Sequence, residues 1–304
     1  MTPDDFRGLW RRLTWHRDAP ISEPADIAVF RLAELARRSV TVVLSGEGSD
    51  ELFGGYPKHR FAQASSIAGM LPAPLRSAAL GAIERRLPAS AGRLRIALRA
   101  ITGRDEASRF RGWFSPFTAA ERQALLKDSA RHPEAGWLQE PEGDPLRRML
   151  LIDMQSWLPD NLLERGDRMS MVASLELRPP FLDRRMLELA FSLPSSLKVH
   201  KGTAKWLIKQ VALRYLPESI VNRRKVGFRV PLDVWFREGL EAFAWDTLTA
   251  KNSFASSAFD PQLVRQLLDR HRNGSVNEEI RIWTLLCLEV WHQEFFRSGD
   301  IEGS

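Results

Sequence analysis

One short stretch of the chain has apolar residues at successive positions instead of alternating ones. Residues 40–44 read Val-Thr-Val-Val-Leu, a β-branched run of the length of a strand. Apolar side chains on both sides of a strand indicate cover on both faces, as in a parallel sheet. The sequence therefore predicts one buried strand at 40–44.

Most of the remaining chain has the apolar spacing of amphipathic helices. Thr118 begins one helix with a capping box, and Asp144 caps another that ends before Pro159. The pattern predicts helices over 24–38, 57–70, 74–87, 93–101, 118–128, 144–158, 183–193, 203–215, 231–248, 260–272 and 278–296. The chain itself is thus expected to be mostly α-helical with one buried strand.

The predicted strand leads into a glycine-rich turn that is followed by carboxylates. Residues 45–48 read Ser-Gly-Glu-Gly, and Asp50 and Glu51 come directly after Ser49. Backbone N–H groups in such a turn suit phosphate or nucleotide contacts, and the two carboxylates lie where a cation on a polyphosphate could be held. A tight turn with carboxylates at a helix start would have the same sequence without any ligand.

Two later segments complete a set of three motifs. They read WLPDNLLERGDRMSM at 157–171 followed by SLELRPPFLD at 174–183, and NRRKVGFRVPL at 222–232. Together and in this order, the three motifs resemble the synthetase domain of glutamine-dependent asparagine synthetases. That family shows S-G-[DE]-G-x-D-E-[LV]-F-x-G-Y, D-R-x-S-M-x-x-S-L-E-x-R-x-P-F-L-D and R-x-K-x-G-F. The resemblance covers roughly residues 15–237.

Two features of that family do not occur in this sequence. No Ser-Gly-Gly occurs, so the nucleotide loop S-G-G-x-D-S is absent, and position 2 is Thr where the glutaminase domain needs Cys. We therefore expect the later part of a synthetase domain, entered after the nucleotide loop. Residues 1–56 would be a remnant of the nucleotide-binding core, and residues 57–304 the helical remainder of one continuous domain.

The resemblance implies a fold and a reaction. The fold is α/β, similar to the adenine nucleotide alpha hydrolases, with a parallel sheet and helices. The reaction is ATP-dependent amide formation, in which aspartate forms β-aspartyl-AMP and ammonia attacks it. Ammonia would come from a glutaminase domain not present here. The cofactors would be ATP and Mg²⁺.

Five residues carry the roles that the resemblance implies. Ser45 and Gly46 would contact ATP through the main chain, and Glu47 would serve acyl-adenylate formation and take a proton from the attacking nitrogen. Asp50 would hold Mg²⁺ on the pyrophosphate, and Lys225 would stabilise the phosphate charge as pyrophosphate leaves. The alternatives are plain turn formation, a solvated loop carboxylate and a solvated basic loop.

The second motif also concentrates four charged residues among apolar ones. We expect them to form a partly buried ion-pair network that positions the site; they are Asp167, Arg168, Glu176 and Arg178.

Other functions remain open beside an asparagine-synthetase-type enzyme. The chain could be a non-catalytic fragment, or a subunit completed by a separate chain that carries the nucleotide loop. It could also belong to a related amide ligase that acts on another carboxylate. Autonomous activity is not expected in the first two cases.

Composition narrows the remaining classes. The 304 residues carry a net charge of +6 from 44 basic and 38 acidic side chains, a modest surplus that does not indicate nucleic-acid binding. One cysteine, Cys287, forms no intrachain disulfide, and the six histidines lack zinc-ligand spacing. An acidic start and the lack of an apolar run of about 18 residues argue against a signal peptide and a membrane span. We predict a cytoplasmic protein.

Overall fold

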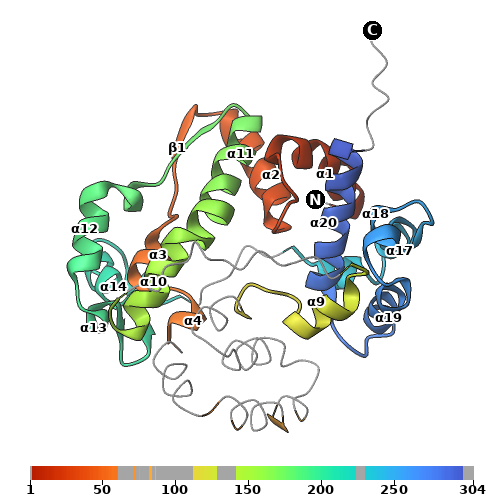
Figure 1. The fold of residues 1–304 in the computed structure, drawn as a ribbon. Coiled ribbons are helices and arrows are strands. Elements are labelled where there is room, and N and C mark those ends of the chain that lie inside the picture. Colours follow the sequence, from red (N-terminus) through yellow and green to blue (C-terminus); the bar gives the residue numbers. More distant parts are fainter. Residues whose placement is uncertain are drawn as a thin grey trace.

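Helices dominate the computed structural model of the chain (Figure 1). The structure describes residues 2–60, 112–128, 142–223 and 230–296, with five single positions between 72 and 86. The elements up to residue 128 are α1 (Pro3–Arg17), α2 (Ala25–Arg37), β1 (Val42–Leu44), α3 (Ser49–Phe53), α4 (Pro57–Arg60) and α9 (Ala119–Leu125).

The range 142–223 contains both helices and short strands. Its elements are α10 (Pro145–Gln155), the π-helix η1 (Leu158–Leu163), α11 (Glu164–Val172), β2 (Glu176–Arg178), the 3₁₀-helix η2 (Pro180–Leu182), α12 (Arg184–Ser192), α13 (Ser195–Lys198), β3 (Val199–His200), β4 (Thr203–Ala204), α14 (Trp206–Ala212) and α15 (Glu218–Val221). The range 230–296 contains α16 (Leu232–Trp235), α17 (Glu241–Thr249), α18 (Phe254–Ala258), α19 (Pro261–Arg272) and α20 (Glu279–Phe296).

Several helix starts follow from side-chain caps. The Thr118 hydroxyl accepts from the Glu121 amide, and the Glu121 carboxylate accepts from the Thr118 amide, which confirms the predicted capping box. Asp144 accepts from two amides at the start of α10, as predicted. The same kind of capping box, between Thr2 and Asp5, begins α1, a helix that the apolar pattern did not predict.

Three predicted helices have other bounds in the structure. The helix at 203–215 begins only at Trp206, because residues 203–204 pair with 199–200 as a hairpin. The helix at 231–248 is divided into α16 and α17; Gly239 lies in the break, where an added Cβ would meet Pro3 at 2.9 Å. The helix from Asp144 ends at Gln155, and Pro159 lies inside η1 instead of ending a helix. Most of 57–101 lies outside the described residues.

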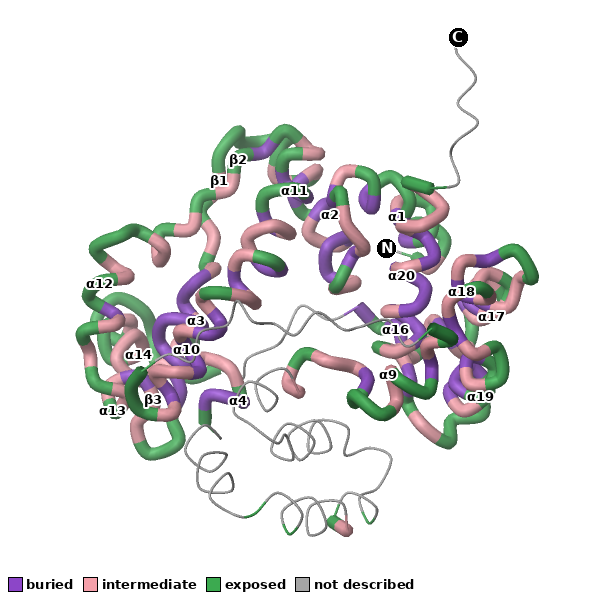
Figure 2. The backbone as a smooth tube through the Cα atoms, in the orientation of Figure 1, coloured by how far each residue is buried: buried purple, intermediate pink, exposed green. Residues whose placement is uncertain are grey.

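The predicted strand forms, but it is not buried. β1 pairs in parallel with β2, with Val42 opposite Glu176 and Leu44 opposite Arg178. Leu44 is 74% exposed and Val42 39%, and Figure 2 shows exposed and intermediate residues along both strands. The prediction of burial was wrong because, among the described residues, β2 is the one strand beside β1 and the side chains of Val42 and Leu44 are left exposed. β2, β3 and β4 were not predicted.

Three apolar clusters among the described residues hold the elements in place. The largest core joins α1, α2 and α11 to α16–α20, and at its centre the rings of Trp10 and Trp283 stack at 4.3 Å. A smaller core takes up α3, whose Leu52 and Phe53 pack with Ala190 of α12. This packing anchors the short helix α3 and so fixes the turn at residues 45–48 that precedes it.

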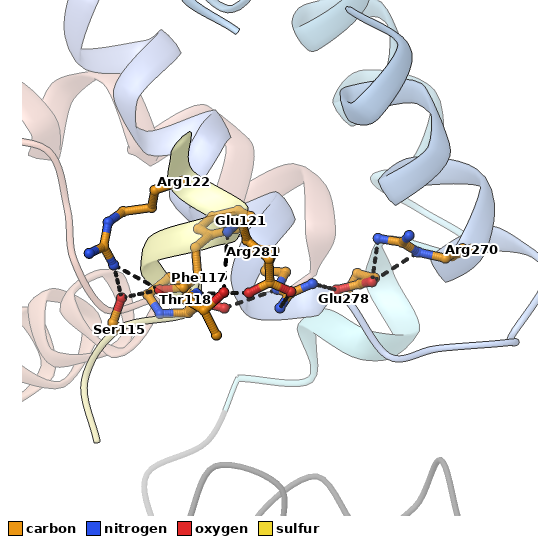
Figure 3. Close-up of polar contacts among 9 residues, drawn as sticks. Ser115, Phe117, Thr118, Glu121, Arg122, Arg270, Glu278 and Arg281 are labelled. Carbon is orange, nitrogen blue, oxygen red and sulfur yellow. Dashed lines mark hydrogen bonds and ion pairs between the residues drawn. The ribbon is translucent and has the colours of Figure 1, made fainter. Parts of the chain in front are cut away.

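Arg281 of α20 attaches α9 to this framework (Figure 3). Its guanidinium lies 2.6 Å from Glu121 and donates to the carbonyl oxygen of Pro116 at 2.9 Å. It also pairs with Glu278 at 3.3 Å, which in turn pairs with Arg270 of α19 at 2.9 Å. The segment 112–128 is thus held to the large core by a chain of charges.

None of the described helices is long and apolar enough to cross a membrane.

Candidate active site

A tight turn links the end of β1 to α3. Gly48 has a φ of +87°, and a Cβ there would overlap the Leu182 side chain. A side chain would therefore be strained both by the backbone angle and by contact. Gly46 has open space around its Cα and no such angle. Its main chain is accessible, as a nucleotide contact would require.

Glu47 projects from this turn toward α11. The hydroxyl of Ser45 donates to Oε2 of Glu47 at 2.6 Å. Gly166 of α11 lies so near that an added Cβ would come within 3.3 Å of Oε1. The Glu47 carboxylate is therefore held between its own turn and the second motif.

Asp50 and Glu51 point to different partners, although they are neighbours. Oδ1 of Asp50 lies 2.8 Å from Nζ of Lys205. Glu51 is 1% exposed and accepts a hydrogen bond from the hydroxyl of Tyr56. Burial raises the pKa of Glu51. Asp50, with its side chain 19% exposed, is thus the less buried of the two carboxylates.

Lys205 reaches the site from the far side of α3. Besides Asp50, its ammonium group donates to the hydroxyl of Ser49 at 2.8 Å. Its backbone has a φ of +53°, a left-handed conformation that is uncommon outside glycine. This conformation sits between β4 and α14 and directs the side chain at α3.

Asp153 of α10 is the centre of a buried polar cluster behind α3. Lys58 donates to its Oδ1, and Nε2 of His59 lies 2.8 Å from its Oδ2. The amide of Tyr56 donates to Nδ1 of His59 at 3.2 Å, so Nε2 carries the proton. Burial lowers the pKa values of Lys58 and His59. Burial alone would raise the pKa of Asp153, but Lys58 and His59 hold it below its ordinary value. The cluster fixes the chain directly after α3.

A buried ion pair braces the segment that leads to Gly166. Arg17 of α1 donates to the carbonyl oxygen of Asp160 at 3.1 Å, and its Nε lies 3.6 Å from Oδ2 of Asp26. Asp160 belongs to η1, which continues directly into α11. Single π-turns are frequent at functional sites. Here the wide helical turn of η1 sets the direction in which α11 approaches the turn at residues 45–48.

The charged residues of the second motif do not form the expected network. Arg168 pairs at 2.9 Å with Glu164 one turn earlier, and Arg178 pairs at 2.7 Å with Glu176 two residues earlier. Both pairs are exposed. The prediction was wrong because α11 and β2 turn these side chains outward, where each finds a local partner. The second motif contributes the main chain of β2 and Gly166 to the surroundings of the turn at residues 45–48.

Comparison with known proteins agrees with the motifs. The sequence model described as Asparagine synthase matches residues 1–293. The chain belongs to the asparagine synthase family. The predicted resemblance is thereby confirmed.

Curated relatives of this chain are longer than the chain itself. A putative asparagine synthetase [glutamine-hydrolyzing] of Mycobacterium bovis is 33% identical over 97% of this chain and 46% of its own length. Asparagine synthetase [glutamine-hydrolyzing] 1 of Bacillus subtilis is 30% identical over 96% of this chain and 46% of its own length. Amidase chyE of Penicillium rubens is 25% identical over 73% of this chain and 37% of its own length. The chain thus spans less than half of each.

The predicted site residues of this asparagine synthase chain divide into two groups. Ser45, Gly46, Glu47 and Asp50 lie together on the turn and the first turn of α3. Lys225 lies outside the described residues, so its place opposite Asp50 stays a prediction.

The residues present fit Mg²⁺ only as part of a larger set. Among the described residues, no three His, Cys, Asp or Glu side chains come together as a metal site. Asp50, whose side chain is 19% exposed, offers one carboxylate at the start of α3, where Lys205 contacts both it and the hydroxyl of Ser49. Mg²⁺ commonly takes one or two carboxylates and completes its shell with water and phosphate oxygens. One carboxylate from this chain suits that pattern.

Lys205 resembles a position of the family, but the sequence does not indicate its role, and it was not among the predicted site residues. The signal that could have found it is its position, since Gly202-Thr203-Ala204-Lys205 breaks the apolar pattern before a helix. Only the folded chain brings that position to Asp50.

Proposed function

We propose that this chain is the later part of an ATP-dependent amide ligase of asparagine synthetase type. Aspartate would attack the α-phosphate of ATP to give β-aspartyl-AMP and pyrophosphate. Ammonia would then attack the acyl carbon to give asparagine, with AMP as the leaving group. The observation that carries the proposal is the position of Glu47, held at 2.6 Å by Ser45 and against Gly166 of the second motif. Membership of the asparagine synthase family supports it.

Each of the five predicted site residues has a role in the proposed reaction. The main chain at Ser45 and Gly46 would bind the nucleotide at the carboxyl end of β1. Glu47, close to developing charge, would orient the acyl carbon and take the proton from the attacking ammonia. Lys225 would balance the charge of the departing pyrophosphate. Asp50 would hold Mg²⁺, which neutralises phosphate charge when bound.

Completion of the site by another polypeptide segment is the second part of the proposal. The chain spans 46% of two curated relatives, and Leu44 of β1 is 74% exposed. A parallel strand with apolar side chains is normally covered and paired on both edges. We therefore infer that the segment with the family's Ser-Gly-Gly-x-Asp-Ser loop packs beside β1, from the same or a separate chain. A glutaminase domain would deliver ammonia.

The acceptor and the location in the cell are proposed from the sequence alone. The acceptor is taken as aspartate by family, with another carboxylate as the alternative. The cytoplasm is our prediction for the location.

The decisive experiment measures pyrophosphate release from ATP with aspartate and ammonium chloride. We expect no release by the purified chain alone, and release when a segment from a relative that carries the nucleotide loop is co-expressed and co-purified with it. The same segment with its loop aspartate changed to Asn is the matched control. Release by the chain alone would contradict the need for completion, and no release by the complex would contradict the ligase proposal.

A further inference from the structure

Lys205 and Asp50 form an ion pair inside the candidate site. Their side-chain atoms are 2.8 Å apart, and Lys205 also donates to Ser49 at 2.8 Å. The side chains are 24% and 19% exposed, while Oδ1 of Asp50, the atom that faces the ammonium, is itself buried. Nothing in the reaction proposed above requires Lys205.

Two local backbone features allow this ion pair to form. The left-handed backbone of Lys205 (φ +53°) is costly and persists only where the surroundings enforce it. Gly55 lies directly beneath, and a Cβ there would overlap both the Asp50 carboxylate and the Lys205 side chain. The pair therefore needs a glycine at 55 and a strained residue at 205, and both are present.

A free cation and a phosphate-bound cation would meet this pair differently. A free divalent cation that approaches Asp50 meets the Lys205 ammonium at the same oxygen, and binding would leave the ammonium without that partner. A cation already bound to a polyphosphate brings an anion for Lys205 as well. The exchange then replaces one ion pair by two, because the cation pairs with Asp50 and a phosphate oxygen pairs with Lys205.

We propose that the Asp50–Lys205 pair is exchangeable and selects metal–polyphosphate over free metal. Asp50 passes from the ammonium to the cation, and Lys205 passes from Asp50 to a phosphate oxygen. The inference rests on the proposed function, in which Asp50 is the metal carboxylate. It adds Lys205 as a residue that determines specificity for the metal-bound nucleotide.

The test compares the binding of free Mn²⁺ and of Mn²⁺–pyrophosphate to the full chain. Free Mn²⁺ is followed by its electron paramagnetic resonance signal, and the pyrophosphate complex by the relaxation of bulk water protons. Lys205→Met keeps the length of the side chain and removes its charge. Lys209→Met, one turn further along α14, makes the same charge change away from Asp50. Circular dichroism checks that each variant is folded.

We expect Lys205→Met to bind free Mn²⁺ at least about 10-fold more tightly than the wild type, because a cation next to the carboxylate is removed. Lys209→Met should match the wild type. Adding Asp50→Asn to Lys205→Met should abolish the gain. The wild type should prefer Mn²⁺–pyrophosphate to free Mn²⁺, and Lys205→Met should lose that preference.

Two results would overturn the inference. One is equal affinity of Lys205→Met and Lys209→Met for free Mn²⁺. The other, which needs no variant, is a wild type that binds free Mn²⁺ as tightly as Mn²⁺–pyrophosphate. The proposed function fails separately, when Asp50→Asn leaves pyrophosphate release by the completed enzyme unchanged. If Asp50→Asn abolishes release while Lys205→Met binds free Mn²⁺ like the wild type, only the exchange is wrong.

Discussion

The amide of Ser45 donates a hydrogen bond of 2.9 Å to the carbonyl oxygen of Arg178. This bond continues the parallel pairing of β1 and β2 by one step, from the last strand residue into the turn. Two motifs that are far apart in the sequence therefore end at one edge of the sheet, where ligands bind in α/β proteins. Since α11 leads into β2, the same connection brings Gly166 to Glu47.

Glu47→Gln is expected to slow amide formation by the completed enzyme by about 10²-fold or more, because a positioned general base contributes about that much. The amide keeps the shape of the side chain and its contact with Ser45, so stability should not change. Asparagine formation and pyrophosphate release are the measurements. Glu34→Gln, on the exposed side of α2, is the matched control and should be neutral. Near-normal turnover of Glu47→Gln would remove this residue from the catalytic set.

The sequence predicted the local features of this site well. The turn, the caps at Thr118 and Asp144 and the family itself follow from short motifs, since each depends on residues a few positions apart. The position of Glu47 in the turn also follows from the motif.

Long-range features could not be predicted in the same way. Lys205 lies opposite Asp50 only because a hairpin and a left-handed residue precede α14. Arg17 of α1 donates a hydrogen bond to the carbonyl oxygen of Asp160 in η1, a contact between segments far apart in the sequence. The exposure of Leu44 depends on what lies beside β1, which no local pattern records.

Lys225→Ala is expected to reduce pyrophosphate release by the completed enzyme by about 10²–10³-fold, the usual effect of removing a preorganised charge-stabilising group. The reason is the loss of a cation from the departing phosphates. Lys251→Ala, an exposed lysine after α17, makes the same change elsewhere and should leave the rate unaltered. A rate for Lys225→Ala within twofold of this control would show that the basic loop is merely solvated.

The stability of the chain should fall as the pH rises from about 4 to about 7, in part because of Asp26. Burial raises the pKa of this carboxyl from 3.8 to about 7, although Arg17 and Arg165 favour its ionised form and Glu23 opposes it. Between these two pH values the folded state holds a proton that the unfolded state has released, so each rise in pH favours unfolding. This contribution becomes nearly constant about one pH unit below 3.8 and about one unit above 7, where the carboxyl has the same protonation in both states.

Urea unfolding of the wild type and of Asp26→Asn at several pH values isolates this effect, because other titrating groups are common to both proteins. The free energy of unfolding of the wild type should decrease more steeply than that of Asp26→Asn between pH 4.5 and 7, and the two slopes should agree above about pH 8. Parallel curves across the whole range would mean that Asp26 is ionised in the folded chain.

Gly48→Ala is expected to lower the free energy of unfolding by about 1–3 kcal/mol, since it adds a side chain at positive φ and in contact with Leu182. Gly46→Ala, two residues earlier in the same turn, has open space and should change it by less than about 0.5 kcal/mol. Urea unfolding measures both. In a Leu182→Ala background the cost of Gly48→Ala should shrink but not vanish, because the contact is relieved while the backbone strain remains. Equal costs for the two glycine substitutions would mean that the turn has another conformation in solution.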